Sequence, residues 1–235
     1  MKAKQVILLK LTGEVLQMNH QHMLEGHLVR KIAQQIYQLR NSHYFGIVIG
    51  GGNFFRGNKQ GAQLGISPSV GHQIGMVATV MNGLIVKDLF EQEGLSTTLF
   101  SAVPSSEIGI AISAQNIKKA YESGDCPIFA GGTGNPFFST DTNAIVRGLQ
   151  INADFVWKGT NVDGIYTADP RTQSNAQLLP CVSYQEALKD NLKILDATAF
   201  ALAKEHNLKI RVFNIFKDDA LLKAAHNESF GSLVQ

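Results

Sequence analysis

Four short segments of the chain combine glycine with residues that bind anions. They are residues 10–13 (KLTG), 50–57 (GGGNFFRG), 131–135 (GGTGN) and 158–160 (KGT). The first two contain the cations Lys10 and Arg56, and the last begins with Lys158. Glycine lets backbone N–H groups approach a phosphate closely, and a helix that begins beyond the turn adds a favourable dipole. One such segment is weak evidence, because glycine is common in ordinary turns. Four of them predict a site for an anionic ligand.

The third segment runs into an unusual loop, GTGNPFFSTDTNA, at residues 132–144. Phe137 and Phe138 are large apolar side chains in a stretch that otherwise has the composition of a solvated turn. One ring can line a binding site while the other anchors the loop, and the sequence does not decide which does which. Asp141 has two interpretations, since Thr140 or Asp141 can cap the following helix, and a carboxylate here can also hold a lysine or a metal.

These segments follow short β-rich runs that alternate with helical patterns, which is typical of βαβ units around a largely parallel sheet. Ligands of such sheets bind outside the carboxyl ends of the strands, so the four segments should converge on one crevice. We expect strands at residues 5–11, 45–49, 97–101, 127–130, 154–158 and 209–213. We expect helices at residues 24–39, where Leu24, Leu28, Ile32, Ile36 and Leu39 form a stripe, and at 67–86, 114–123, 142–150, 184–189, 196–206 and 219–227.

The helix predicted at residues 67–86 has no charged side chain, and its apolar residues do not fit on one stripe. A helix that is apolar all round must be covered all round. Polar residues such as His72 and Asn82, together with three glycines, argue against a membrane span. Either the subunit encloses the helix, or one side packs on the core and the other on a second subunit, and we favour the second subunit.

Composition indicates a soluble globular protein: of 235 residues, 44% are apolar and 17% charged, with a net charge of +2. No block of like charges suggests a nucleic-acid or membrane surface. Cys126 and Cys181 have no metal-binding or disulfide-framework spacing, which favours a reducing compartment. His20 and His22 are expected to be exposed residues rather than metal ligands. The chain also lacks the P-loop, HExxH and GxSxG motifs.

Six motifs in order along the chain resemble the bacterial uridylate (UMP) kinases of the amino acid kinase superfamily. They are KLTGEVL, VIGGGNFFRG, GMVATVMNGL, AGGTGNPFFSTDT, KGTNVDGIYTADP and IRVFN, and the resemblance runs from about residue 6 to residue 234. It implies a three-layer α/β/α sandwich with an open, mainly parallel central sheet, formed by residues 1–235 as one domain. The N-terminal part would lie mainly on the UMP side and the C-terminal part mainly on the ATP side. It further implies a cytoplasmic homohexamer that transfers the γ-phosphate of ATP to UMP with Mg²⁺ in pyrimidine nucleotide biosynthesis, without need of a nucleic acid.

Matching the motifs residue by residue implies particular sites. The ATP site would comprise Lys10, Leu11, Thr12, Gly13, Gly52, Arg56, Thr160, Tyr166 and Asp169. The UMP site would comprise Gly51, His72, Thr133, Gly134, Asn135, Pro136, Phe137, Phe138, Ser139 and Thr140. Lys10, Arg56 and Asp141 would be catalytic, with Lys158 as a further charge, and no metal ligands are assigned.

The chain departs from the family pattern at three positions. His72 stands where these enzymes usually have an aspartate that contacts the ribose of UMP, so we hypothesise a weaker or pH-dependent KM for UMP, unless His72 only packs. Glu91 and Thr98 stand where basic side chains would serve a GTP effector, which argues against activation by GTP.

Two rival functions stay open at this point. The first is an amino acid kinase that phosphorylates a carboxylate, whose acceptor site would need a cation and would have no use for two phenylalanines. The second is a non-catalytic nucleotide-binding protein on the same fold, against which the retained Lys10, Arg56 and Asp141 argue.

Overall fold

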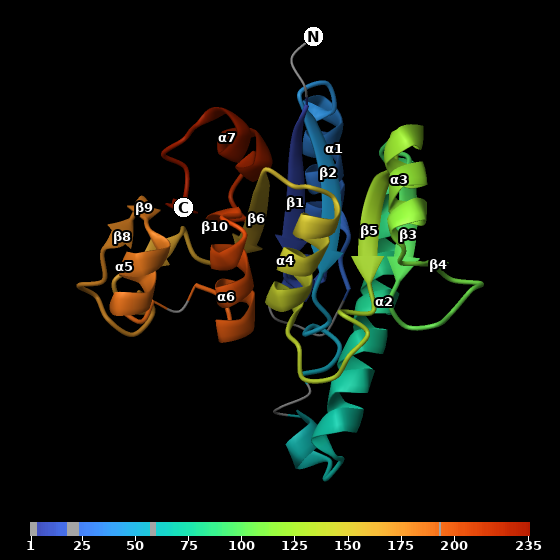
Figure 1. The fold of residues 1–235 in the computed structure, drawn as a ribbon, viewed down its shortest axis with the longest axis horizontal. Helices are drawn as coiled ribbons and strands as arrows, with labels where there is room; N and C mark the ends of the chain where they lie inside the picture. Colours follow the sequence, from blue (N-terminus) through green and yellow to red (C-terminus); the bar gives the residue numbers. More distant parts are fainter. Residues whose placement is uncertain (1–3, 18–23, 57–59, 193) are drawn as a thin grey trace.

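A nine-stranded, mainly parallel sheet forms the centre of the molecule in the computed structural model, which describes residues 4–17, 24–56, 60–192 and 194–235 (Figure 1). The order across the sheet is β4-β3-β5-β2-β1-β6-β10-β11-β9, and β10 and β11 are the antiparallel neighbours. The strands are β1 (Gln5–Leu11), β2 (His43–Ile49), β3 (Thr97–Ser101), β4 (Ile110–Ala111), β5 (Cys126–Ala130), β6 (Phe155–Thr160), β9 (Cys181–Val182), β10 (Lys209–Asn214) and β11 (Ser232–Val234). A separate hairpin pairs β7 (Ile165–Tyr166) with β8 (Leu178–Leu179).

Helices cover both faces of this sheet, which confirms the expected three-layer α/β/α architecture. They are α1 (His27–Leu39), α2 (Pro68–Gln92), α3 (Ala114–Ser123), α4 (Thr140–Gln150), α5 (Tyr184–Lys189), α6 (Ala197–Glu205) and α7 (Ala220–His226), with a 3-10 turn η1 (Gly13–Leu16). One apolar core joins the sheet to α1, α2 and α7, and a second joins it to α3, α4, α5 and α6. In Figure 1, α4 and α6 lie in front of the sheet and α1 lies behind it.

The central strand β1 fixes the position of the phosphate-binding turn that follows it. Ile7, Leu8, Leu9 and Leu11 are fully buried, although consecutive side chains of a strand point to opposite faces. Such a run suits a parallel strand covered by helices on both sides. Its carboxyl end therefore presents Lys10 at the edge of a rigid core.

All six predicted strands are confirmed, and the helices differ from expectation mainly at their ends. Leu24 was expected on the stripe of the first helix, but α1 begins at His27 and Leu24 is half exposed. Helix α2 begins at Pro68, where Ser67 Oγ accepts from Val70 N, and continues to Gln92 beyond the charge-free stretch. The strands that the sequence does not predict have two or three residues each. Among the predicted strands, β2 begins two residues earlier than expected, at His43.

Helix α2 is covered on one side only. Val86 and Phe90 are buried against the sheet, whereas Val70, Ile74, Val77, Met81 and Leu84 form an exposed apolar row that we name the α2 stripe. A helix enclosed within its own subunit is therefore excluded. In length and composition α2 would suffice to cross a membrane, but it packs on β3 and β5 and buries polar Thr79 and Asn82, as a core helix does. In Figure 1 it runs past the carboxyl ends of the strands.

Candidate active site

The four glycine-containing turns meet at one edge of the sheet, as the sequence predicts. They follow β1, β2, β5 and β6, which are consecutive neighbours in the order β5-β2-β1-β6 and run parallel. The first two turns touch, because Gly50 N donates to Leu11 O at 3.0 Å. A Cβ on Gly13 would collide with the side chain of Asn53, so only glycine fits where these turns cross.

Asp141 lies between two lysines that come from different strands. Its Oδ1 is 3.1 Å from Lys10 Nζ and its Oδ2 is 2.7 Å from Lys158 Nζ. The three side chains retain only 14 to 17% of their exposure. Two positive charges face one negative charge here, and the excess positive charge suits a phosphate.

The surroundings shift the pKa of two of these side chains, Asp141 and Lys158. Burial alone would raise the pKa of Asp141, but the ammonium groups of Lys10 and Lys158 outweigh it and hold that pKa below its ordinary value. Burial lowers the pKa of Lys158, and the neighbouring Lys10 lowers it further, against the opposing effect of Asp141. Asp141 is therefore ionised near neutral pH, and its role is to hold cations rather than to accept a proton.

The structure corrects the expected cap of α4. The N-cap residue is Ser139, whose Oγ accepts from the backbone N of Asp141 at 3.0 Å and of Thr142 at 3.2 Å. Neither Thr140 nor Asp141 occupies that position. The carboxylate of Asp141 is thus available to the two lysines.

Arg56 is held away from the lysines in this structure. Its Nη2 is 2.9 Å from Glu14 Oε1, and its Nε donates to Gly52 O at 3.2 Å. The guanidinium is 61% exposed. Arg56 and Lys10 come from adjacent turns, as expected, but Arg56 contacts Glu14 whereas Lys10 contacts Asp141.

A cavity of about 320 Å³, which we name the α2–α4 cavity, gathers part of the implied UMP site. Its lining includes Gly51, His72, Phe138, Ser139 and Thr140, together with Gly52 and Arg56 of the implied ATP site. Thr133, Gly134, Asn135, Pro136 and Phe137 do not line it. The implied UMP residues are therefore divided between the wall of this cavity and the loop outside it.

The two phenylalanines play different parts. Phe138 lines the α2–α4 cavity, whereas Phe137 is 68% exposed and contacts His72 from outside, with ring centroids 4.9 Å apart. Phe137 also has a φ of +71°, a conformation that is costly for a bulky residue. Backbone strain of this kind is typical of binding loops.

A second cavity, of about 480 Å³, lies beside the β7–β8 hairpin, and we name it the hairpin cavity. Lys158, Thr160, Tyr166 and Asp169 line it, so three residues of the implied ATP site lie together beside Lys158. Asp169 is 2.9 Å from Arg171 Nη2. Lys158 belongs to this cavity and contacts Asp141, so it connects the hairpin cavity with the start of α4.

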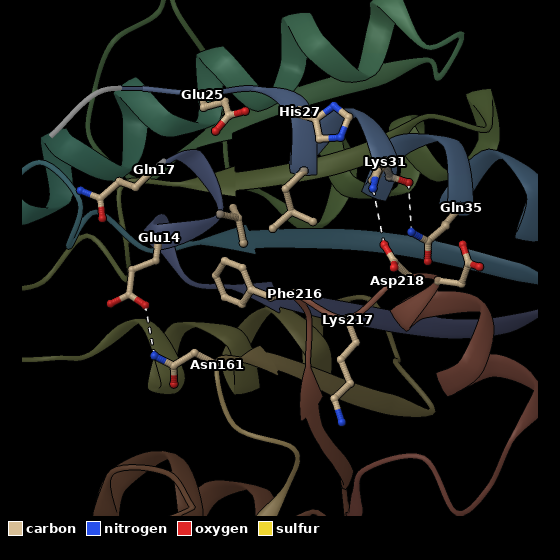
Figure 2. Close-up of a pocket in the computed structure, with 13 residues that line it drawn as sticks. Glu14, Gln17, Glu25, His27, Lys31, Gln35, Asn161, Phe216, Lys217 and Asp218 are labelled. Carbon is tan, nitrogen blue, oxygen red and sulfur yellow. Dashed lines mark hydrogen bonds and ion pairs between the residues drawn. The ribbon is translucent and has the colours of Figure 1, made fainter. Parts of the chain in front are cut away.

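A third cavity, of about 590 Å³, contains none of the implied site residues. Figure 2 shows it between η1, α1 and the segment after β10, with Glu14, Lys31 and Phe216 among its walls. Glu14 connects it to the site, because Glu14 pairs with Arg56 and also accepts from Asn161 Nδ2 at 3.4 Å (Figure 2).

Several residues that hold the site together were missed by sequence reasoning. Asn82 Nδ2 donates to Gly50 O at 2.6 Å, and Thr79 Oγ1 accepts from Gly131 N at 2.8 Å. The signal for both was their polarity in an otherwise apolar helix. Asp196 bonds the start of α4 and gave no signal, since it resembles any helix N-cap.

The described residues contain no group of three His, Cys, Asp or Glu side chains that could hold a metal alone. Asp141 has both carboxylate oxygens beside lysines. Magnesium in kinases is held largely by nucleotide phosphates and one or two carboxylates. A site with few free carboxylates therefore fits a magnesium ion whose ligands come mainly from the nucleotide. His20 and His22, expected to be exposed, lie outside the described residues.

Comparison with known proteins identifies the chain. The sequence profile of the amino acid kinase family matches residues 5–214. A uridylate kinase from Mycoplasma genitalium is 42% identical over 236 residues, which cover 100% of this chain and 97% of that relative. A uridylate kinase from Coxiella burnetii is 42% identical over 97% of this chain and 94% of its own length. The crystal structure of UMP kinase from Ureaplasma parvum superposes with a TM-score of 0.94 at 34% identity and covers 99% of both chains. The chain belongs to the amino acid kinase family, and within it to the uridylate kinases.

Proposed function

We propose that this chain transfers the γ-phosphate of ATP to UMP and releases UDP and ADP. The observation that carries the proposal is Asp141, held between Lys10 and Lys158. Its neighbour Thr140 lines the α2–α4 cavity and its partner Lys158 lines the hairpin cavity. UMP would occupy the α2–α4 cavity, where Phe138 offers an apolar wall for the base. ATP would place its adenosine in the hairpin cavity beside Tyr166.

The chemistry requires positioning and charge neutralisation rather than a base. The acceptor oxygen belongs to the phosphate of UMP and is already ionised, so no proton has to be removed. The bond from the γ-phosphorus to the β,γ-bridging oxygen breaks, while a bond to the UMP oxygen forms. Lys10 and Lys158 would neutralise the transferring group from one side. Arg56, once released from Glu14, would do so from the acceptor side.

Magnesium would supply further neutralisation at the ATP phosphates when bound, and those phosphates would provide most of its ligands. We further propose that residues 1–235 act as one domain, that the enzyme is cytoplasmic and that it serves pyrimidine nucleotide synthesis. The continuous sheet, which joins both halves of the chain through β1 and β6, supports the single domain. The α2 stripe supports a homo-oligomer, and a hexamer is the form we expect.

The rival reactions find less support in this site. A carboxylate acceptor would have no use for the apolar wall that Phe138 adds to the α2–α4 cavity. A non-catalytic protein would have no need of two partly buried lysines around Asp141.

A coupled assay of ADP release with UMP, CMP, aspartate and acetylglutamate tests the proposal. We expect turnover that depends on UMP. Turnover with aspartate or acetylglutamate alone would replace UMP by a carboxylate acceptor, and ATP binding without turnover on any acceptor would support the non-catalytic protein.

A further inference from the structure

The carboxylate of Asp196 joins the start of α6 to the start of α4. Thr142 Oγ1 lies 3.0 and 3.1 Å from its two oxygens, and Ser139 Oγ also donates to Oδ2. Ala199 N donates to Oδ1 at 3.0 Å, so Asp196 is at the same time the N-cap of α6. Asp196 lines neither cavity of the site.

Through Ser139 this carboxylate acts on Asp141. A serine hydroxyl has one proton to donate and two lone pairs to accept with. Ser139 gives its proton to Asp196, which directs its lone pairs to the backbone N of Asp141 and Thr142. The first turn of α4, which carries the Asp141 side chain, is thereby fixed to Asp196.

The same short segment also holds Lys158. Ile194 O accepts from Lys158 Nζ at 2.7 Å, two residues before Asp196. Segment 194–196 therefore fixes both partners of the pair between Lys158 and Asp141, one through a backbone carbonyl and the other through a side chain. Lys158 and Ile194 line the hairpin cavity and Ser139 lines the α2–α4 cavity, whereas Asp196 lines neither.

We propose that Asp196 is a positioning residue that sets the placement of Asp141 against Lys158, and through it the alignment of the transferring phosphate. The inference rests on the proposed phosphoryl transfer to UMP. It predicts that loss of this carboxylate lowers kcat while the binding of each nucleotide is retained. Displacement of reacting groups by about 1 Å can cost on the order of a hundredfold in rate.

Asp196→Ser separates positioning from capping. Serine is as good an N-cap as aspartate, so α6 keeps its cap, but its short neutral hydroxyl cannot bind Ser139 and Thr142 together. We expect kcat to fall by about tenfold to a hundredfold, with KM for ATP and UMP changed less than about twofold. The melting temperature should fall somewhat, because the buried Thr142 hydroxyl loses its acceptor. A kcat within about twofold of the original chain would overturn the inference.

Ser113→Ala is the matched control for a lost cap. Ser113 Oγ caps α3 by accepting from Asn116 N at 3.1 Å, and it lines neither the α2–α4 cavity nor the hairpin cavity. This variant should show a lower melting temperature and keep its kcat. If it lost kcat as strongly as Asp196→Ser, a general effect of helix stability would explain both results and the inference would fail.

A double-mutant cycle of Asp196→Ser with Thr142→Val tests whether Asp196 acts through the first turn of α4. Thr142 is 3% exposed, and valine preserves its shape while it removes the hydroxyl. If Asp196 acts through the start of α4, the double variant should lose less kcat than the product of the two single losses. Fully independent losses would contradict the route. Because every variant is compared with the original chain, absence of UMP turnover in that chain would refute the proposed function instead.

Discussion

At the scale of single residues, the site pairs its cations with carboxylates. Lys10 faces Asp141 and Arg56 faces Glu14. Partnered cations avoid the cost of buried unpaired charge. They are also preorganised, which is how fixed donors stabilise a transition state.

Removal of either cation should therefore lower the rate of phosphoryl transfer. We expect Lys10→Ala and Arg56→Ala each to lose at least about a hundredfold in kcat, since one preorganised donor is worth on the order of 3 to 4 kcal/mol. Steady-state kinetics beside sedimentation would check this, because the oligomer should remain intact. Near-normal turnover of either variant would remove that residue from the mechanism.

The burial of Lys158 leads us to expect that kcat falls at alkaline pH. Burial places its pKa below that of an ordinary lysine, about 10.4. As the pH rises, its ammonium should lose its proton before an exposed lysine does, and kcat should fall with it. Arginine stays protonated throughout this range, so Lys158→Arg should move the decline of kcat to higher pH. An unchanged alkaline profile in that variant would assign the decline to another group.

The position of His72 leads us to expect that this residue affects KM for UMP. It lines the α2–α4 cavity and contacts Phe137, in the place of a family aspartate. Aspartate would restore a fixed acceptor for ribose hydroxyls, so His72→Asp should lower KM for UMP by about tenfold or more, on the scale of one charged hydrogen bond of about 1.5 kcal/mol or more. The comparison should extend from pH 5.5 to 8. If KM is the same in both proteins throughout, His72 serves only to pack against Phe137.

At the scale of helices and strands, the sequence reveals buried parallel strands and the turns that follow them. Residues 126–130 are a five-residue apolar run followed by glycines, and in the structure they form the fully buried strand β5 with a turn directly after it. Two-residue strands such as β4 and β7 have no period to detect. The cap of α4 was missed because Ser139, Thr140 and Asp141 are adjacent and each can cap a helix. Only the backbone geometry selects among them.

Asp196 shows what local reasoning cannot supply. Its N-cap role in α6 follows from its neighbours, but its bond to Thr142 spans 54 positions of sequence. That contact depends on how α4 and α6 pack together, which no periodicity in either helix encodes.

Asn82 links helix α2 to the turn after β2 and predicts a loss of stability. It is fully buried and exchanges hydrogen bonds with Asn53 at 2.7 and 3.0 Å besides its bond to Gly50. Asn82→Ala would leave these buried groups unpaired, at about 1 to 3 kcal/mol each. Urea denaturation should show the loss, while Asn116→Ala, at an exposed hydrogen bond of α3, should cost far less. Equal midpoints for both variants would show that Asn82 is dispensable.

At the scale of the whole molecule, the exposed α2 stripe lies on the same helix as part of the wall of the α2–α4 cavity. Large apolar patches on soluble proteins usually mark interfaces, and here one side of α2 packs on the sheet while Val77 and Met81 remain 50% and 45% exposed on the other. The same helix supplies His72 and Met76 to the α2–α4 cavity. A second subunit on the stripe would therefore hold the wall of the acceptor cavity in place.

Charge on the stripe should break this assembly without unfolding the subunit. In the double variant Val77→Glu and Met81→Glu, each new carboxylate would have to be buried in the interface, which is strongly unfavourable. We expect a smaller sedimentation coefficient at low micromolar concentration, retained helix content and a raised KM for UMP. Leu188→Glu, at a 54% exposed leucine of α5 outside the stripe, should sediment like the original chain. If the double variant also sediments like the original chain, or if the original chain is itself monomeric, the stripe is not an interface and its exposure needs another cause.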